Sequence, residues 1–228
     1  MKTLTWLGPP QAGDWFPPLE AALDDPPGLL AAGGDLAPQR IIAAYRRGIF
    51  PWYSAGQPVL WWSPDPRAVL FPDEFHRSRS LAKAERNRGF ETRLDVDFGS
   101  VVDECAAPRE YADGTWITPE MRAAYVALHR HGRAHSVETW VADELVGGLY
   151  GVQLGRIFFG ESMFSRCSDA SKVALARLVD ECETRGIVAI DCQMHTPHLQ
   201  SLGCRMLPRS EFVALLAREA SQTVPDAW

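Results

Sequence analysis

The feature that most restricts the fold lies within residues 135–190. Residues 135–141, 145–152 and 156–164 alternate between apolar and polar side chains and are separated by short turns, which predicts a three-stranded antiparallel meander. Residues 170–184 have helical spacing, and Gly186 is placed to end that helix. Residues 187–190 form a short apolar run that is typical of a buried strand. We therefore expect the helix to be a right-handed crossover from the meander to the buried strand.

This order of elements is that of an acyltransferase-type α/β unit. A last helix is expected to begin near Ser210 and to end before the polar tail. The length of 228 residues allows one large domain or two small ones, with enough chain to bury a core. The fold class predicted from the pattern is therefore α/β (α+β), with a mixed, mostly antiparallel sheet.

Two polar residues follow the buried strand. If the strand continues through Asp191 and Gln193, both side chains leave the same face of the sheet. A carboxylate at the end of a buried strand is costly unless something neutralises or uses it. Two interpretations stay open at this point. Asp191 either caps a turn or pairs with an arginine such as Arg205, or it belongs to a functional site.

Glu161 has a similar ambiguity. It lies in the third strand of the meander, in the run Phe158-Phe-Gly-Glu-Ser-Met-Phe164. It is either exposed on the polar face of the strand or buried for a purpose, and the pattern alone favours neither.

Aromatic residues gather in two clusters around a Gly/Pro turn. The first cluster is Ile49-Phe-Pro-Trp-Tyr53 and the second is Leu60-Trp-Trp62. They form either a packed corner between domains or the wall of an apolar pocket. Large aromatic side chains are mostly buried, which favours the packed corner, although a small core needs fewer of them.

Residues 76–88 concentrate positive charge in an acidic chain of net charge −6. A helix through this segment would place Arg79, Lys83 and Arg86 on one side, at positions i, i+4 and i+7. A solvated helix face is the ordinary interpretation of such a run. A local basic patch on an acidic protein is also what contact with a phosphate backbone requires.

The composition is that of a globular protein in a reducing compartment. The five cysteines are odd in number and contain no Cys-x-x-Cys pair. No apolar run approaches the roughly 20 residues needed to cross a bilayer, and the first residues lack the apolar core of a secretory signal. We expect a cytoplasmic protein with no membrane partner.

Several kinds of chemistry are not expected. Binding of coenzyme A at the crossover helix requires a glycine-rich loop, but residues 164–172 contain no glycine and Asp169 would repel an anion. No carboxylate accompanies His129, His131 and His135 in a pattern typical of zinc ligands, so we expect no zinc site. Alternation directs Cys192 away from Asp191 and Gln193, which favours a buried, inert thiol.

The chain resembles a known family in several segments that occur in the family's order between residues 28 and 209. They are Leu29-Leu-Ala-Ala-Gly-Gly-Asp-Leu36, Tyr45-Arg-Arg-Gly-Ile-Phe-Pro-Trp52, Leu60-Trp-Trp-Ser-Pro-Asp-Pro-Arg67, Gly114-Thr-Trp-Ile-Thr118, His135-Ser-Val-Glu138, Leu145-Val-Gly-Gly148, Gly160-Glu-Ser-Met-Phe-Ser165 and Ile190-Asp-Cys-Gln193. These segments look like the motifs of bacterial leucyl/phenylalanyl-tRNA–protein transferases.

The resemblance implies a small N-terminal domain at residues 1–65 and a catalytic domain like the GCN5-related acetyltransferases (GNAT) at residues 66–228. It implies transfer of Leu or Phe, and weakly Met, from aminoacyl-tRNA to the N-terminal Arg or Lys of an acceptor protein, which marks that protein for N-degron proteolysis. No metal or other cofactor is implied, and we expect a monomer.

The resemblance also implies roles for residues already singled out. Asp191 and Gln193 match a catalytic pair in which Asp191 polarises Gln193 and Gln193 hydrogen-bonds the attacking amine, and Glu161 matches the family's active-site glutamate. Direct general-base action by Asp191 and pure positioning of Gln193 both remain open, because an ordinary carboxylate is a poor match for an amine proton.

Binding residues follow in the same way. Four aromatic residues match positions near the 3′ adenosine of the tRNA, where stacking suits an unpaired base: Tyr45, Trp52, Trp116 and Tyr125. A pocket for the amino-acid side chain is expected to use Leu149, Phe158 and Ile190. The basic segment becomes the contact for the acceptor-stem backbone, through Arg77, Arg79, Lys83, Arg86 and Arg88.

The chain departs from the family pattern at two places, and three alternative functions are open. Thr196 stands near the position where the family often has Asn, and the tail ends early.

The first alternative is a transferase with another donor or acceptor, such as one that acts on acidic N-termini. Glu161 and Asp191 argue against it, because their charges would repel an acidic acceptor. A non-catalytic tRNA-binding module would not need Asp191 with Gln193. An acetyltransferase would have to bind coenzyme A without glycines.

Overall fold

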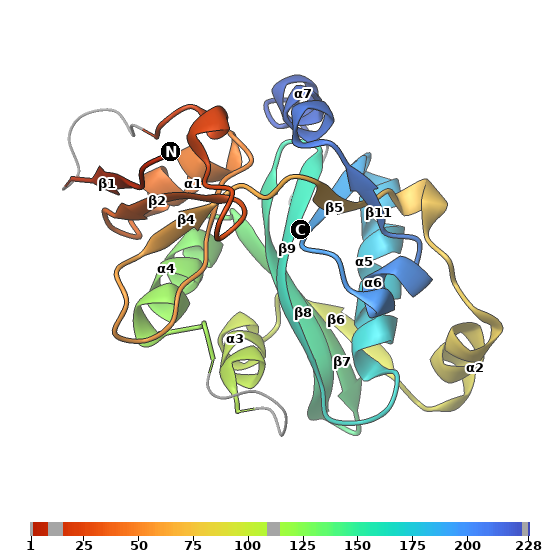
Figure 1. The fold of residues 1–228 in the computed structure, drawn as a ribbon. Helices are drawn as coiled ribbons and strands as arrows, with labels where there is room; N and C mark the ends of the chain where they lie inside the picture. The colour runs from red at the N-terminus through yellow and green to blue at the C-terminus, as the bar shows by residue number, and fades with distance from the viewer. Residues whose placement is uncertain (1, 9–15, 109–114, 225–227) are drawn as a thin grey trace.

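The computed structural model describes residues 2–8, 16–108, 115–224 and 228. Two sheets organise these residues (Figure 1). The smaller sheet has the strand order β1-β2-β4-β3, and its strands are β1 (Thr5–Leu7), β2 (Leu29–Gly33), β3 (Phe50–Pro51) and β4 (Leu60–Trp62).

The larger sheet has seven strands in the order β11-β5-β10-β9-β8-β7-β6. Its strands are β5 (Arg67–Leu70), β6 (Glu91–Leu94), β7 (Ala134–Val141), β8 (Glu144–Leu154), β9 (Ile157–Ser165), β10 (Ala189–Gln193) and β11 (Arg205–Leu207). Strands β9 and β10 run parallel, and the other neighbouring strands of this sheet run antiparallel. The predicted mixed, mostly antiparallel sheet is therefore confirmed.

The meander and its crossover have the predicted arrangement. Strands β7, β8 and β9 pair in sequence order, and β10 joins β9 with Ala189 opposite Ile157. The helix between β9 and β10 is α5 (Ala170–Arg185), and Gly186 ends it in a left-handed conformation with φ of 70°. A glycine adopts that conformation without the steric cost of a Cβ atom.

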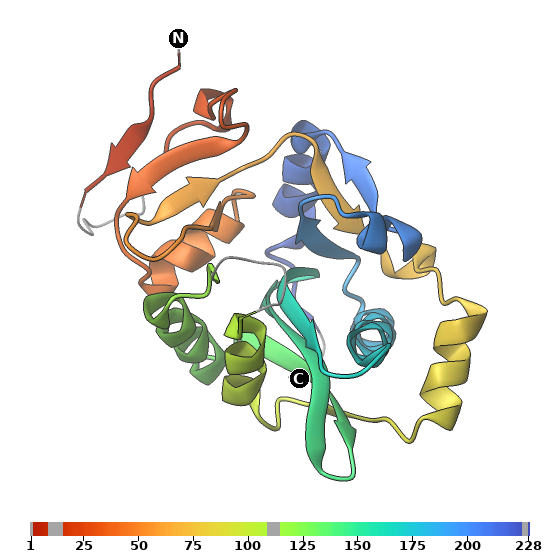
Figure 2. The same ribbon diagram turned by 60° about the horizontal axis from the view of Figure 1, so that its bottom comes forward.

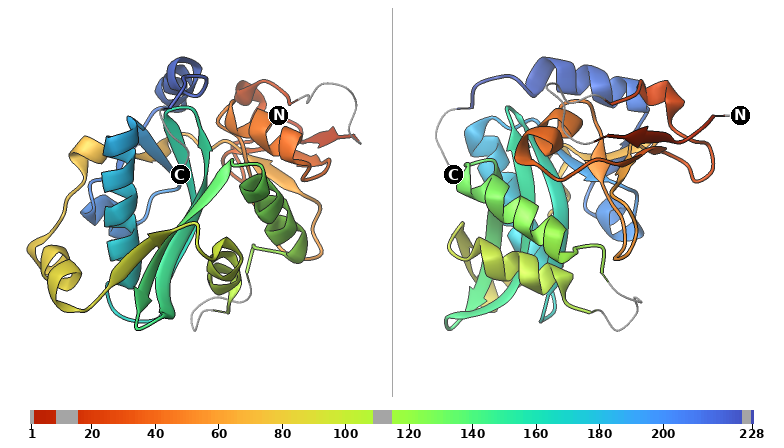
Figure 3. Two further views of the ribbon diagram at one scale, coloured as in Figure 1. Left: turned by 180° about the vertical axis from the view of Figure 1, so that it is seen from behind. Right: turned by 90° about the vertical axis from the view of Figure 1, so that its left-hand side faces the viewer.

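Helices cover both faces of the large sheet. One face carries α5, and the opposite face carries α3 (Phe98–Ala106) and α4 (Pro119–Arg130), as the two views in Figure 3 show. The other helices are α1 (Pro38–Tyr45), α2 (Arg79–Asn87), α6 (Pro197–Ser201) and α7 (Arg209–Glu219), with short 3-10 turns at Leu19–Ala21 and Pro72–Glu74.

One apolar core continues from the small sheet into the large one. It contains Trp61 of β4, Ile41 of α1 and Phe159 of β9, all fully buried. A second core lies beneath α5 on the other face. The small sheet and α1 lie beside the large sheet on its α4 side (Figure 2). The division of the chain at residues 65/66 stays a prediction, because the two sheets share this core.

Local signals explain where two helices begin. Thr118 caps α4 by accepting a hydrogen bond from the Met121 backbone N–H, and Pro119 is the first helical residue. Asp35 resembles a helix cap in the sequence but does not cap α1: Ala37 precedes the helix, and the Asp35 carboxylate accepts from the Ala37 N–H and from Arg40. A short loop therefore separates Asp35 from the helix.

The aromatic clusters contribute to both a core and a surface. Trp61 is fully buried and donates its indole N–H to the Gly33 carbonyl at 3.0 Å. Trp52, by contrast, leaves 39% of its surface exposed and packs edge-on against Trp62. Both interpretations of the clusters are thus correct, for different residues.

The described part of the chain contains no helix that combines the length and apolar character needed to cross a membrane. All five cysteines are free thiols.

We expect Gly151→Ala to lower the free energy of unfolding by about 1–3 kcal/mol, the usual cost of overpacking. Gly151 lies at a β-bulge between β8 and β9, where an added Cβ would overlap the Phe159 carbonyl and the Phe158 ring. Gly99→Ala in α3 is the control, because its Cβ would make only ordinary contacts; we expect it to be neutral or stabilising by less than about 1 kcal/mol. Urea denaturation measures both, and equal effects would contradict the close packing at Gly151.

Candidate active site

Glu161 lies at the centre of a buried hydroxyl cluster. Its two carboxylate oxygens accept hydrogen bonds from the phenols of Tyr45 and Tyr125, each at 2.6 Å, and the two phenol oxygens lie 2.9 Å apart. Tyr45 ends α1, which contacts the small sheet, and Tyr125 lies within α4, which contacts the large sheet, so both helices reach this strand. The alternative left open for Glu161 is resolved: it is half-buried and held by two donors.

Burial raises the pKa of Glu161 to about 7, although the hydrogen bonds from Tyr125 and Tyr45 lower it. The charge on Asp191 raises this pKa further, and that on Arg67 lowers it. Burial and the nearby Glu161 charge also raise the pKa of both phenols well above the ordinary value, so these phenols remain protonated donors. Glu161 is therefore a carboxylate that gains or loses its proton near neutral pH.

Asp191 is fully buried and forms a bidentate ion pair with Arg67. Arg67 donates from Nε to Oδ1 at 2.8 Å and from Nη2 to Oδ2 at 2.7 Å. Pairing with an arginine was one of the predicted alternatives, but the proposed partner was wrong. Arg205 pairs instead with Glu74, because it lies on β11, on the far side of β5 from Asp191.

Gln193 departs from regular strand geometry. The register between β10 and β5 shifts between Asp191 and Gln193, and Gln193 has a left-handed backbone with φ of 56°. Its backbone N–H donates to Asp191 Oδ1 at 3.0 Å, and its side-chain Nε2 lies 3.5 Å from Glu161 Oε1. The simple alternation predicted for this pair ends at the bulge, so Asp191 faces Arg67 while Gln193 reaches Glu161.

A largely apolar cavity of 420 Å³ opens between β9, β10 and α5. Its apolar lining includes Leu149, Met163, Leu175, Leu178 and Ile190, and Glu161 and Gln193 supply polar groups. Leu149 and Ile190, two of the three residues predicted for an amino-acid pocket, line this cavity. Phe158 does not, because its fully buried ring packs in the core below and contacts Trp228.

A second, smaller cavity of 230 Å³ meets the first. Trp52, Trp116 and Met194 line it, and it shares Glu161, Cys192 and Gln193 with the larger cavity. Of the four aromatic residues predicted for base stacking, Trp52 and Trp116 reach this cavity. Tyr45 and Tyr125 do not reach it, because both rings are completely buried and use their hydroxyls to hold Glu161.

The predicted basic helix is α2, and its charges fall into two groups. Arg77 pairs with Asp180 and Glu85, and Arg88 pairs with Asp169. A second group is exposed and forms no ion pair with any described residue: Arg79, Lys83 and Arg86. The apolar side of α2 packs on α5 through Leu81.

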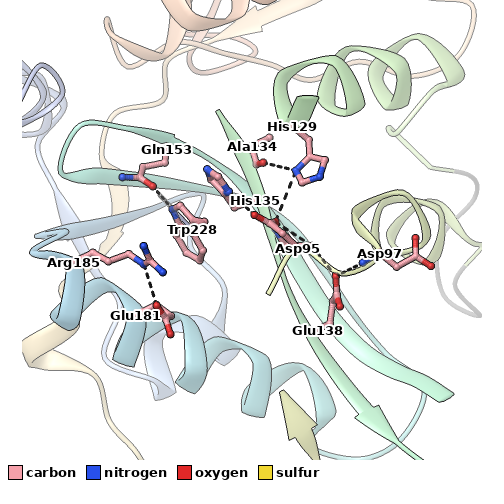
Figure 4. A network of polar contacts seen from close by, with 11 residues as sticks. Asp95, Asp97, His129, Ala134, His135, Glu138, Gln153, Glu181, Arg185 and Trp228 are labelled. Atoms are coloured by element: carbon pink, nitrogen blue, oxygen red, sulfur yellow. Dashed lines mark hydrogen bonds and ion pairs between the residues drawn. The ribbon is translucent and has the colours of Figure 1, made fainter. Parts of the chain in front are cut away.

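His129 and His135 belong to a polar network (Figure 4), and neither residue lines either of the two cavities. His135 Nδ1 lies 2.7 Å from Asp95, and His129 Nδ1 lies 2.8 Å from the Ala134 carbonyl oxygen. The His135 ring stacks on Trp228. Within residues 2–8, 16–108, 115–224 and 228, no three His, Cys, Asp or Glu side chains are arranged to hold a metal ion.

Comparison with known proteins identifies the family. A family model described as leucyl/phenylalanyl-tRNA protein transferase matches residues 69–217, and a model of its N-terminal domain matches residues 34–65. The chain belongs to this family. A leucyl/phenylalanyl-tRNA–protein transferase of Pseudomonas entomophila strain L48 is 60% identical over 225 residues, covering 99% of each chain. That of Pseudomonas aeruginosa strain LESB58 is 60% identical over 219 residues, covering 96% of each.

Solved structures give lower similarity. L-PGS from Bacillus licheniformis has a TM-score of 0.40 at 15% identity, covering 57% of this chain and 46% of its own. A GCN5-related N-acetyltransferase from Kribbella flavida has a TM-score of 0.39 at 11% identity, and the match covers 71% of this chain and 57% of the acetyltransferase.

Two features of the site escaped sequence reasoning. Arg67 ends the motif Leu60-Trp-Trp-Ser-Pro-Asp-Pro-Arg67, yet nothing in its spacing pairs it with Asp191, 124 residues away. Cys192 lines both cavities although alternation predicted a buried thiol, because the bulge turns this end of β10. A hydrogen bond with Cys204, followed by burial, raises the pKa of the Cys192 thiol well above its ordinary value.

We expect Glu161 to titrate with a pKa of about 7, and Tyr125→Phe to raise that pKa, because the lost hydrogen bond favours the ionised carboxylate. NMR of ¹³C-labelled glutamate carboxyl groups across pH 5–9 measures both values, and Glu161→Gln assigns the signal. A pKa near that of an exposed glutamate, about 4.3, would contradict the buried environment.

The same pKa predicts a pH-dependent contribution to stability. Because the folded-state pKa lies above that of the unfolded chain, Glu161 stabilises the fold most below about pH 4.3, and this contribution is lost as the pH rises through 7. Glu161→Gln should therefore gain stability relative to the wild type between pH 5 and pH 8. Denaturation at both pH values measures the difference.

Proposed function

We propose that this protein transfers Leu or Phe, and Met more weakly, from aminoacyl-tRNA to the N-terminal Arg or Lys of acceptor proteins. The observation that carries the proposal is the meeting of an apolar cavity and an aromatic cavity at Glu161 and Gln193. An aminoacyl ester of adenosine has the same two parts, an amino-acid side chain and a base, joined at the reactive carbonyl. Membership of the transferase family supports the same reaction.

The donor is placed by the two cavities. The side chain of Leu or Phe enters the larger one, where Leu149 and Ile190 offer apolar surface. The terminal adenine stacks between or beside Trp52 and Trp116 in the smaller one. An unbranched apolar residue such as Met should also enter, because apolar pockets discriminate weakly among side chains of similar size.

The acceptor is selected by charge. Glu161 faces the joint between the cavities with a carboxylate that is partly ionised near pH 7. A cationic N-terminal Arg or Lys would favour the ionised form, whereas an acidic N-terminus would be repelled. Asp191 contributes less to this selection, because Arg67 neutralises its charge.

The chemistry requires mainly positioning. The acceptor's neutral α-amine attacks the ester carbonyl, the C–N bond forms as the C–O bond to the tRNA 3′-oxygen breaks, and that oxygen leaves as a hydroxyl. A free α-amino group has a pKa of about 7.7–8.0, so a strong base is not needed near neutral pH. Gln193 is placed to hydrogen-bond the attacking amine.

The hydrogen bonds of Asp191 distinguish between its three possible roles: polarising Gln193, acting as a general base, and only positioning Gln193. Both of its oxygens already accept hydrogen bonds from Arg67, and Oδ1 also accepts from the Gln193 backbone. This arrangement supports the positioning route over direct general-base action by Asp191. The proton then leaves the amine through solvent at the open joint between the cavities.

The tRNA backbone is proposed to contact α2, with Arg79, Lys83 and Arg86 as the primary contacts because they are exposed and not engaged in ion pairs with described residues. Arg77 and Arg88 play a smaller part, since they hold α2 against the carboxylates of Asp180 and Asp169. We further propose that the product is an N-degron, and that the protein acts as a monomer in the cytoplasm without a cofactor.

Transfer of labelled Leu from Leu-tRNA to peptides that differ only in their first residue tests the reaction. We expect product with Arg and Lys peptides and little with Asp or Ala peptides, because only the first two pair with Glu161. Transfer to the Asp peptide would refute the assignment of Glu161 to the acceptor. Binding of tRNA without transfer to any peptide would favour a non-catalytic tRNA-binding module.

Charge reversal on α2 tests the tRNA contact. We expect Arg79→Glu with Lys83→Glu to weaken tRNA binding and to reduce the slope of log K against log salt by about 0.7–0.9 per lost phosphate contact. The matched control is Arg130→Glu with Arg133→Glu, which makes the same change in net charge at exposed positions at the end of α4. Equal effects of both pairs would show a response to net charge rather than a contact at α2.

A further inference from the structure

Arg67 lines neither cavity, yet its side chain is held by several contacts beside the site. Only 1% of the residue is exposed, and its guanidinium lies over the Phe50 ring at 4.7 Å and the Phe212 ring at 4.9 Å. Besides its two bonds to Asp191, it donates from Nη1 to the Gly48 carbonyl at 3.1 Å. A planar guanidinium can make these bonds in fixed directions at the same time.

One branch of this network leads to Gln193. Asp191 is held by Arg67, and its Oδ1 accepts the Gln193 backbone N–H. A left-handed backbone is unfavourable for a residue with a Cβ atom, so a specific interaction is needed to hold it. The bond from Gln193 to the fixed carboxylate supplies one, and it directs the Gln193 amide toward Glu161.

The other branch leads to Glu161. Gly48 lies in the turn that ends α1, where its N–H donates to the Tyr45 carbonyl at 3.0 Å. The Tyr45 hydroxyl in turn donates to Glu161. A single guanidinium is therefore connected to both functional groups, through the turn after α1 on one side and through β10 on the other.

We propose that Arg67 is a positioning residue that sets the Gln193 amide and the Glu161 carboxylate relative to each other. This inference deepens the proposed function and rests on it for the meaning of any change in rate. Lysine at this position would keep the charge but could not bond to both Asp191 oxygens and Gly48 in one plane.

The principal test compares Arg67→Lys with Arg205→Lys. Arg205 is a matched control, because it also pairs with a carboxylate and lies over an aromatic ring, Phe71, but on β11 and away from the cavities. We expect Arg67→Lys to lower kcat about 10- to 100-fold, the cost of a displacement of about 1 Å in a reacting complex. KM for aminoacyl-tRNA should change by less than about threefold, because substrate-binding side chains are untouched. Arg205→Lys should leave both unchanged.

Hydrogen exchange provides a measurement that does not depend on the reaction. In Arg67→Lys, the Gln193 backbone amide should exchange at least about tenfold faster, while the Ile190 amide in the same strand changes little. A general loss of stability would accelerate both amides together. This contrast separates failure of the present proposal from failure of the proposed function, because it holds even if no transfer is detected.

A second variant covers the case in which Arg67→Lys does not fold. Phe212→Leu removes one ring from the guanidinium without changing any charge, and Phe71→Leu is its control under Arg205. We expect Phe212→Leu to give a smaller change of the same kind in kcat and in Gln193 exchange. The proposal would be overturned if the Gln193 amide exchanged at the wild-type rate in every variant of Arg67 and Phe212 that folds. It would also be overturned if the control variants of Arg205 and Phe71 had effects of the same size.

Discussion

The buried ion pair between Arg67 and Asp191 is the interaction on which the site depends. Two charges with almost no exposure to water carry a desolvation cost of several kcal/mol each, which is recovered only with good geometry and further hydrogen bonds. Here the carboxylate has a bidentate partner and a backbone donor, and the guanidinium has a carbonyl and two aromatic rings. Loss of either partner leaves an unpaired buried charge, which typically costs about 3–5 kcal/mol. Stability and geometry of the site are therefore linked.

Two neighbouring carboxylates have opposite environments. Asp191 lies against a permanent positive charge, whereas Glu161 is surrounded by neutral hydroxyl and amide donors. A carboxylate with neutral donors in a partly dry site can change its protonation state near neutral pH, as the pKa of about 7 indicates. One carboxylate is thus suited to a structural task and the other to the recognition of a cation.

Much of the fold could be predicted from the sequence, because local signals determine it. The meander, α4 with its Thr118 cap and α5 with Gly186 all depend on alternation, capping residues and glycine. The small sheet was missed, since its strands are only two to five residues long and lie among prolines and glycines. Gln193 and Trp52, which each lie in a short motif, line the cavities, and Asp191 is bonded to the Gln193 backbone. The partnership of Arg67 with Asp191 and the burial of Tyr45 and Tyr125 depend on contacts between distant segments, which spacing along the chain does not encode.

The shared wall between the two cavities has a consequence for ligand design. Glu161, Cys192 and Gln193 line both cavities, so the two cavities adjoin. A molecule that fills only one of them makes few contacts, yet it loses as much translational and rotational entropy on binding as a larger ligand does. Joining two such fragments by a short linker makes the second binding event intramolecular, with an effective concentration in the millimolar range for short flexible linkers. For the donor proposed above, such a ligand is a nucleoside joined through a non-hydrolysable amide to an apolar amino acid, and we expect it to bind more tightly than either half alone.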